Sequence, residues 1–168
     1  SREDRVSVKL LITYILGVIV LVGALVLLGS STTTKLQTYT ASDAARPIAT
    51  VETNQFDFGA MTNQDIKSTK FTIQNTGQND LALTNVSTSC DCTYAYLRVG
   101  DTESPRFTMH GTKDWSASVP ANTSAELEVI YEPAIMPVQG QVSRTVTVAT
   151  NDPAHPTLTF TVTANVTL

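Results

Sequence analysis

An unbroken apolar run near the N-terminus, residues 10–28, constrains this chain more than any other feature. No Asp, Glu, Lys or Arg occurs between Leu10 and Thr34. About 20 apolar residues in a helix cross the roughly 30 Å hydrocarbon core of a bilayer. A helix also pairs its own backbone polar groups, as lipid requires. We therefore predict a single transmembrane α-helix over residues 10–29, with a domain in water after it.

Basic residues flank this predicted span on its N-terminal side, at Arg2, Arg5 and Lys9, whereas only Lys35 lies close on the other side. Because basic residues near a span stay cytoplasmic, residues 1–9 are expected inside the cell and the larger C-terminal part outside. A cleavable signal peptide is the alternative, but it has an apolar core of only about 7–15 residues. Residues 30–46 are rich in Ser, Thr and Ala and are typical of an extended linker.

Three small residues lie near one face of the predicted span: Thr13, Gly17 and Ala24. Small residues in such positions let a second membrane helix approach closely. They are therefore candidate helix-packing positions, although small residues are also common in membrane helices in general.

The charge balance excludes one class of partner. The net charge is −4, and the tail to Lys9 holds three basic residues against two acidic ones, so the rest of the chain is the acidic part. Nucleic acid binding needs clustered Lys and Arg, so no nucleic acid partner is expected. Adhesion to anionic lipid headgroups is disfavoured for the same reason.

Beyond residue 47 the apolar residues recur with a period of two, which predicts strands. The alternating segments are residues 70–74, 81–83, 127–131, 146–148 and 158–166. Turn signals follow two of them, at Asn75-Thr76-Gly77 and Asn151-Asp152-Pro153. Several short strands separated by turns predict an antiparallel β-sandwich over residues 47–168.

Five short motifs follow one another in this region and carry a family resemblance. They are Phe56-Asp57-Phe58-Gly59, residues 71–77, Ser89-Cys90-Asp91-Cys92-Thr93, Tyr131-Glu132-Pro133 and residues 150–153. In this order they resemble the bacterial domain of unknown function 1573, related to the immunoglobulin-like domains of major sperm protein and of cilia-associated proteins. The resemblance implies an all-β immunoglobulin-like sandwich of seven to eight strands in envelope proteins, generally without known activity. Combined with the predicted span and its orientation, this resemblance leads us to expect a protein of the bacterial inner membrane with its domain in the periplasm.

The chain departs from that family in two places. Asp91 stands between the two cysteines where the family usually has Gly, and residues 98–115 look like an insertion. Four side chains of the insertion are candidate contact residues for a partner: Arg106, Phe107, His110 and Trp115. Core packing is the alternative for Trp115.

Cys90 and Cys92 are the only cysteines, and their spacing leaves four interpretations open. They form a disulfide with each other, remain two reduced thiols, bind a metal or do redox chemistry, or link to another chain. Residues i and i+2 of a strand lie about 6.5–7 Å apart, so a mutual disulfide requires the backbone to bend. Met109 and His110 could complete a soft Cu(I) site with the two thiolates.

No motif for catalysis occurs: there is no Gly-x-Ser-x-Gly and no Walker-type loop, and neither His stands beside an evident nucleophile. His155 is expected to be a turn residue. We therefore expect neither an enzyme nor a cofactor. The sequence favours an accessory or structural subunit that stabilises a larger membrane complex, for example a respiratory or photosynthetic assembly. The alternatives are copper handling or thiol-redox chemistry at Cys90 and Cys92, and an envelope adhesin or folding factor.

Overall fold

The computed structural model describes residues 14–18, 37–110 and 114–168. The chain divides into two compact units, Ser1–Lys35 and Leu36–Leu168. In the first, residues 14–18 are helical and include Gly17. The cytoplasmic tail 1–9, the rest of the predicted span 10–29 with Thr13 and Ala24, and linker residues 30–36 lie outside the described residues.

Within the described part of the chain, no helix has the length and hydropathy needed to cross a bilayer.

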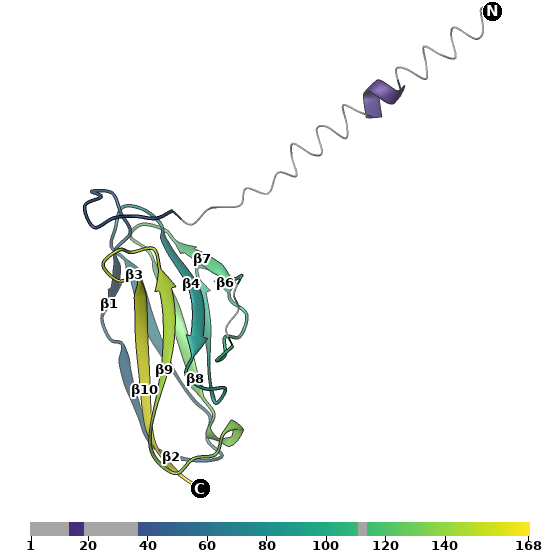
Figure 1. Ribbon diagram of the computed structural model, residues 1–168. Coiled ribbons are helices and arrows are strands. Elements are labelled where there is room, and N and C mark those ends of the chain that lie inside the picture. The colour runs from purple at the N-terminus through teal and green to yellow at the C-terminus, as the bar shows by residue number, and fades with distance from the viewer. Residues whose placement is uncertain (1–13, 19–36, 111–113) are drawn as a thin grey trace, which may run out of the picture. The chain divides into compact units, whose positions relative to one another are not determined.

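The second unit is an all-β sandwich of two five-stranded sheets (Figure 1). The first sheet has the order β1-β3-β8-β5-β6 and the second has the order β2-β10-β9-β4-β7. The strands of the first sheet are β1 (Ala49–Val51), β3 (Lys67–Asn75), β8 (Ser124–Tyr131), β5 (Thr93–Val99) and β6 (Thr102–Glu103). Those of the second are β2 (Gln55–Thr62), β10 (Thr157–Thr167), β9 (Gly140–Thr150), β4 (Leu81–Thr88) and β7 (Ser116–Val119). A short 3-10 helix, η1 (Pro133–Ile135), follows β8.

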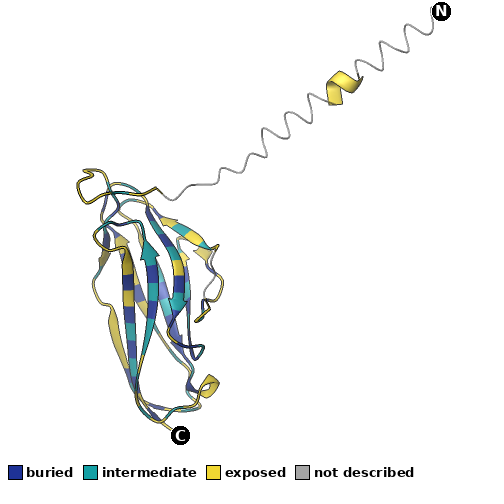
Figure 2. Cartoon of the chain, in the orientation of Figure 1, coloured by how far each residue is buried: buried dark blue, intermediate teal, exposed yellow. Residues whose placement is uncertain are grey.

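The period-two pattern predicts the core correctly. Along β10 every even-numbered residue from Leu158 to Val166 is buried, while the odd-numbered residues are exposed or half-buried. Figure 2 shows this alternation on the long strands of the second sheet. Each sheet therefore turns one apolar face inward, and the two faces form a single core.

The sequence predicts an antiparallel sandwich, and this prediction is wrong at one pair of strands: β2 pairs with β10 in parallel. β1 pairs antiparallel with β3 in the first sheet, and the chain then crosses to the second sheet. At the crossing the Thr161 N–H donates to the Asn54 carbonyl at 2.8 Å, and the Asn54 amide donates to the Thr159 carbonyl at 3.2 Å. β2 and β10 lie at opposite ends of the domain sequence, so their pairing needs no hairpin and parallel geometry is open to them.

The segment that precedes β1 is fastened to the sandwich by the turn after β3. The Gln78 N–H donates to the Arg46 carbonyl at 3.1 Å, and the Thr76 N–H donates to the Ile48 carbonyl at 2.9 Å. A Cβ at Gly77 would overlap backbone atoms of residues 46–48, so this close approach requires glycine. The end of the predicted linker therefore packs onto the domain.

Residues 98–110 build part of the first sheet. The Ser104 N–H donates to the Leu97 carbonyl at 2.8 Å, and Phe107 exchanges two hydrogen bonds with Ala95, at 2.9 and 3.0 Å. The Phe107 ring is fully buried and meets the half-buried Trp115 edge-on, with 4.9 Å between ring centroids. This segment thus covers the open edge of β5 and closes one side of the core.

Candidate functional site

The two cysteines flank a tight turn between β4 and β5, and they are joined to each other. The S–S distance is 2.00 Å and the Cα atoms are 5.3 Å apart. The turn over residues 89–92 supplies the backbone bend that an extended strand lacks. Of the four interpretations that the sequence left open, the structure has the intramolecular disulfide.

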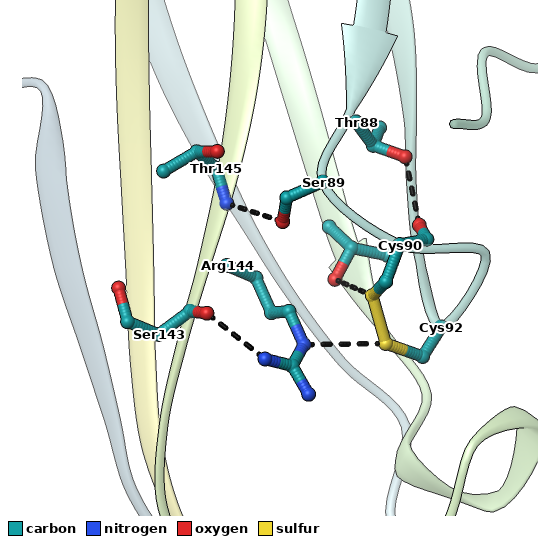
Figure 3. The surroundings of a disulfide bond; sticks show 8 residues. Thr88, Ser89, Cys90, Cys92, Ser143, Arg144 and Thr145 are labelled. Atoms are coloured by element: carbon teal, nitrogen blue, oxygen red, sulfur yellow. Dashed lines mark hydrogen bonds between the residues drawn. A yellow bond between two sulfur atoms is a disulfide. The ribbon is translucent and has the colours of Figure 1, made fainter. Parts of the chain in front are cut away.

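Neighbouring polar groups hold the disulfide turn in place (Figure 3). The Thr88 hydroxyl donates to the Cys90 carbonyl at 2.8 Å, and the Thr93 hydroxyl lies 3.5 Å from the Cys90 Sγ, to which it donates. Ser89 and Thr145 exchange two hydrogen bonds, of 2.9 and 3.0 Å, which tie the turn to β9. Cys92 is fully buried, whereas Cys90 keeps 7% of its surface exposed. Cys90 is thus the less buried residue of the pair.

Arg144 of β9 points at this disulfide (Figure 3). Its Nε donates to the Cys92 Sγ at 3.3 Å, and its Nη1 donates to the Ser143 carbonyl at 3.0 Å. Arg144 alternates with the half-buried Val142 and the buried Val146, so it occupies a core-facing position. Arg144 was not among the residues predicted from the sequence, although the alternation of residues 142–148 places it on the apolar face.

Tyr131 is the second polar group at this end of the core. Its ring centroid lies 5.8 Å from the Arg144 guanidinium carbon. Its hydroxyl is buried and has no hydrogen-bond partner among the described residues. Burial raises the pKa of the Tyr131 hydroxyl, and the charge of Arg144 opposes the rise. The disulfide, the arginine and the phenol form a small polar cluster in an apolar setting.

The proposed copper ligands are partly brought together. The Thr88 N–H donates to the Thr108 carbonyl at 3.3 Å, so residues 108–110 run past the disulfide turn. The His110 Nε2 lies 3.9 Å from the Asp91 carboxylate, and both Met109 and His110 are exposed. No group of three or more His, Cys, Asp or Glu is arranged for a metal within residues 37–110 and 114–168. While the sulfurs are joined they offer no thiolate, and thiolates are what a soft Cu(I) site needs.

A second surface feature lies on the outward side of the first sheet; we call it the tyrosine face and define it as Tyr94, Tyr96 and Arg106. The Arg106 guanidinium carbon lies 3.7 Å from the Tyr94 ring centroid. The two tyrosine rings meet edge-on at 6.3 Å. The Tyr94 hydroxyl donates to the Glu132 carboxylate at 3.3 Å. Burial and the nearby charge of Glu132 raise the pKa of Tyr94.

The predicted contact residues of the insertion therefore occupy different environments. Arg106 and His110 are exposed, and Trp115 is half-buried. The prediction that Phe107 contacts a partner is wrong, because its ring is fully buried against Trp115 and offers no surface to a partner. The local sequence around Phe107 does not predict its burial, because that burial depends on the pairing with Ala95.

His155 lies in the turn between β9 and β10, as expected, beside a shallow groove. Its Nδ1 lies 2.9 Å from a carboxylate oxygen of the fully buried Asp152. The groove holds about 380 Å³ and is lined by β1, by the first half of β10 and by His155. The Asp152 carboxylate also accepts hydrogen bonds from the N–H groups of Ala49 and Ala154, at 3.0 and 2.9 Å. This pair therefore fastens the turn to β1.

Comparisons with known proteins agree with this architecture. Residues 49–100 match the model of a family described as a protein of unknown function, DUF1573. The match covers β1 to β5 and confirms the domain type that three of the five motifs had indicated. The motifs at residues 131–133 and 150–153 lie beyond it. No curated protein matches the chain in sequence.

Among solved structures, a protein of unknown function from Porphyromonas gingivalis W83 superposes with a TM-score of 0.56 at 19% identity. The alignment covers 74% of this chain and 50% of that one, so the chain spans about half of that protein's length. This likeness shows a shared fold. A PapD-like domain of human CEP192 aligns with a TM-score of 0.46 at 12% identity, over 81% of this chain and 96% of that one. The Caenorhabditis elegans major sperm protein family member WR4 aligns at 0.40 and 12%, over 73% and 100%.

Proposed function

We propose that this chain is a non-enzymatic, single-pass membrane protein of the bacterial inner membrane. Its β-sandwich lies in the periplasm and binds other subunits of a larger membrane complex, such as a respiratory or photosynthetic assembly. The domain acts as an accessory subunit that stabilises the assembly by the surface it covers.

The tyrosine face is the observation that carries the binding role. Tyr and Arg are enriched at protein interfaces because both combine a large apolar contact area with polar groups. Here the stacking of Arg106 on Tyr94, and the bond from Tyr94 to Glu132, hold the side chains in one arrangement before binding. Pre-ordered side chains lose less conformational entropy when a partner binds. A periplasmic surface of another subunit is the occupant that this chemistry fits.

The apolar run of residues 10–28 supports the membrane location. An anchored domain also gains in binding, since tethering to the bilayer raises its effective concentration beside other membrane proteins. A partner contact of modest area is then sufficient.

Co-migration in native gels tests this proposal. Membranes that contain the full-length chain are solubilised in mild detergent, and the mass of the species that holds the chain is measured. We expect a species much larger than the 18.1 kDa chain. Replacing two residues of the tyrosine face, Tyr96→Ala with Arg106→Ala, is expected to release the chain as a small species.

Gln74→Ala is the matched control, because Gln74 is exposed on β3 of the same sheet and lies outside the tyrosine face. It is expected to leave the large species unchanged. Migration of the parent chain as a free monomer would contradict the proposal, and so would a double variant that remains in the large species.

A further inference from the structure

Arg144 stands at a core-facing position, and no acidic side chain within residues 37–110 and 114–168 pairs with it. A partly buried cation costs free energy unless an anion or good acceptors compensate it. Among the described ion pairs none involves Arg144. Its hydrogen bonds go to the backbone carbonyl of Ser143 and to the Cys92 Sγ. The guanidinium therefore lacks a full countercharge while the disulfide is intact.

Reduction of the disulfide would supply that countercharge. A disulfide sulfur is neutral and a weak acceptor, whereas a thiolate is an anion that a nearby guanidinium stabilises strongly. At 3.3 Å from Arg144 Nε, the Cys92 sulfur is already at charge-assisted hydrogen-bond distance. Stabilising the reduced form makes a disulfide more oxidising.

We propose that Cys90 and Cys92 form a thiol–disulfide exchange site, with Arg144 as the residue that stabilises the Cys92 thiolate. The substrate class is a protein dithiol, which the site oxidises to a disulfide. This inference goes beyond the accessory binding role proposed above and does not depend on it; it adds a redox activity and so replaces the non-enzymatic part of that proposal.

The unequal burial of the two cysteine residues assigns the order of the steps. A substrate thiolate attacks the Sγ of Cys90, the less buried of the two cysteines, and forms a mixed disulfide. The Cys90–Cys92 bond breaks, and its electron pair goes to the Cys92 Sγ beside Arg144. The second substrate thiol loses a proton to water and attacks the substrate sulfur of the mixed disulfide. Cys90 leaves as a thiolate and takes up a proton. The substrate dithiol has lost two electrons and two protons, and the site holds one thiol, one thiolate and two more electrons.

Redox equilibration of the full-length chain in detergent tests whether Arg144 stabilises the reduced form of the disulfide. The protein is equilibrated with mixtures of reduced and oxidised dithiothreitol, and the reduced fraction is measured from the mass added by a thiol alkylating agent. Arg144→Gln is expected to lower the equilibrium constant for reduction about tenfold or more, since a pKa change of one unit corresponds to a tenfold effect. Arg98→Gln is the matched control, because Arg98 is exposed on β5 and pairs with Glu103. Arg98→Gln is expected to leave the equilibrium constant for reduction unchanged.

The pKa of the Cys92 thiol tests the role of Arg144 directly, with a readout that a merely structural residue would not move. In the Cys90→Ser variant, the pH dependence of alkylation reports the Cys92 thiol alone. Its pKa is expected below the ordinary value of about 8.5, and Arg144→Gln is expected to raise it. Arg144→Lys keeps the cation and is expected to fall between the two.

Three outcomes would overturn the proposal: an ordinary or raised Cys92 pKa with Arg144 present, an Arg144→Gln equilibrium equal to that of Arg98→Gln, or an Arg144→Lys variant no different from Arg144→Gln. Near-ultraviolet circular dichroism of each variant shows whether the fold is kept. If Arg144→Gln fails to fold, the Arg144→Lys comparison with the parent chain decides in its place. Free-monomer migration in the native gel would leave all these results unaffected, so the two proposals fail separately.

Discussion

At the scale of single residues, two buried polar side chains hold the turns of the sandwich. Asn75 is fully buried at the end of β3. Its side-chain oxygen accepts hydrogen bonds from the N–H groups of Ile48 and Gly77, at 3.3 and 3.0 Å. Its amide group donates to the carbonyls of Asn79 and Val119, at 2.8 and 2.9 Å. One side-chain amide therefore connects the residue before β1, the turn after β3, and β7.

Asn75→Asp tests this connection because the carboxylate keeps the shape and the acceptors but loses both donors. It also places a negative charge against two carbonyl oxygens. We expect the free energy of unfolding to fall by about 2–4 kcal/mol, since buried groups left unsatisfied cost about 1–3 kcal/mol each. Urea unfolding of the folded chain measures the change. Gln74→Ala, at the exposed neighbour, should stay within about 0.5 kcal/mol, and equal losses in the two variants would refute this role for Asn75.

Asp152 makes stability depend on acid. Burial disfavours its charged form, but hydrogen bonds from Ala49, His155 and Ala154 outweigh burial and lower the pKa of the carboxyl below its ordinary value. A group with a lowered native pKa stabilises the fold above its unfolded pKa, near 3.9, and loses that contribution as the pH falls through its native pKa.

We therefore expect the parent domain to lose stability below about pH 4. Asp152→Asn is expected to be less stable at neutral pH and to show a weaker acid dependence, because the amide cannot ionise. Thermal melting between acid and neutral pH measures both. An unchanged acid dependence in Asp152→Asn would show that other carboxyls cause it.

At the scale of elements, the sheet edges differ in how they are protected. β1 and β6 are short, and residues 104–107 cover the β5 edge. β2 lies at the edge of the second sheet and, with eight residues, is the longest of the described edge strands. The Lys67 ammonium donates to the carbonyls of Phe58 and Ala60 of β2, at 3.0 Å each. Lysine at an edge hinders pairing with a second chain because extra strand pairing would bury its charge.

Lys67→Met tests this protection. We expect a loss of about 1–2 kcal/mol from the two charge-assisted hydrogen bonds, together with concentration-dependent self-association. Unfolding experiments and sedimentation velocity measure the two effects. Lys70→Met is the control, because it removes a lysine whose surface ion pair with Glu126 contributes little. If both variants remain equally monomeric, Lys67 does not prevent self-association through the β2 edge.

At the scale of the whole molecule, the proposed membrane anchor predicts on which side of the membrane the domain lies. With Arg2, Arg5 and Lys9 inside, the domain should face the periplasm. Protease added to spheroplasts is therefore expected to degrade the domain while an epitope on the N-terminal tail stays protected. The chain should also remain in the membrane after alkaline carbonate extraction. Release into the soluble fraction, or protection of the domain, would contradict the predicted anchor.

The sequence alone determined five of the ten strands and which of their faces are buried, because burial of one face imposes a local period of two. The expected alternation is seen in β3, β4, β9 and β10, and in β8 up to Val129; Ile130, expected on the outer face, is buried as well. The domain type was also readable, since the motifs at residues 56–59, 71–77 and 89–93 are short and local. A disulfide within a Cys-x-Cys turn was one of the interpretations open to the sequence, since such a bond depends on a local bend.

Only the tertiary structure decided the contacts between distant parts of the chain. The parallel pairing of β2 with β10 joins the two ends of the domain. The burial of Phe107 depends on a partner in β5, and the approach of Arg144 to Cys92 spans 52 residues. Such contacts leave no trace in local periodicity, because they join segments far apart in the sequence, the first two by strand pairing within one sheet and the third across the two sheets. The cluster of Arg144, Tyr131 and the disulfide exists only because the stacking of the two sheets brings an inward arginine to the end of the core.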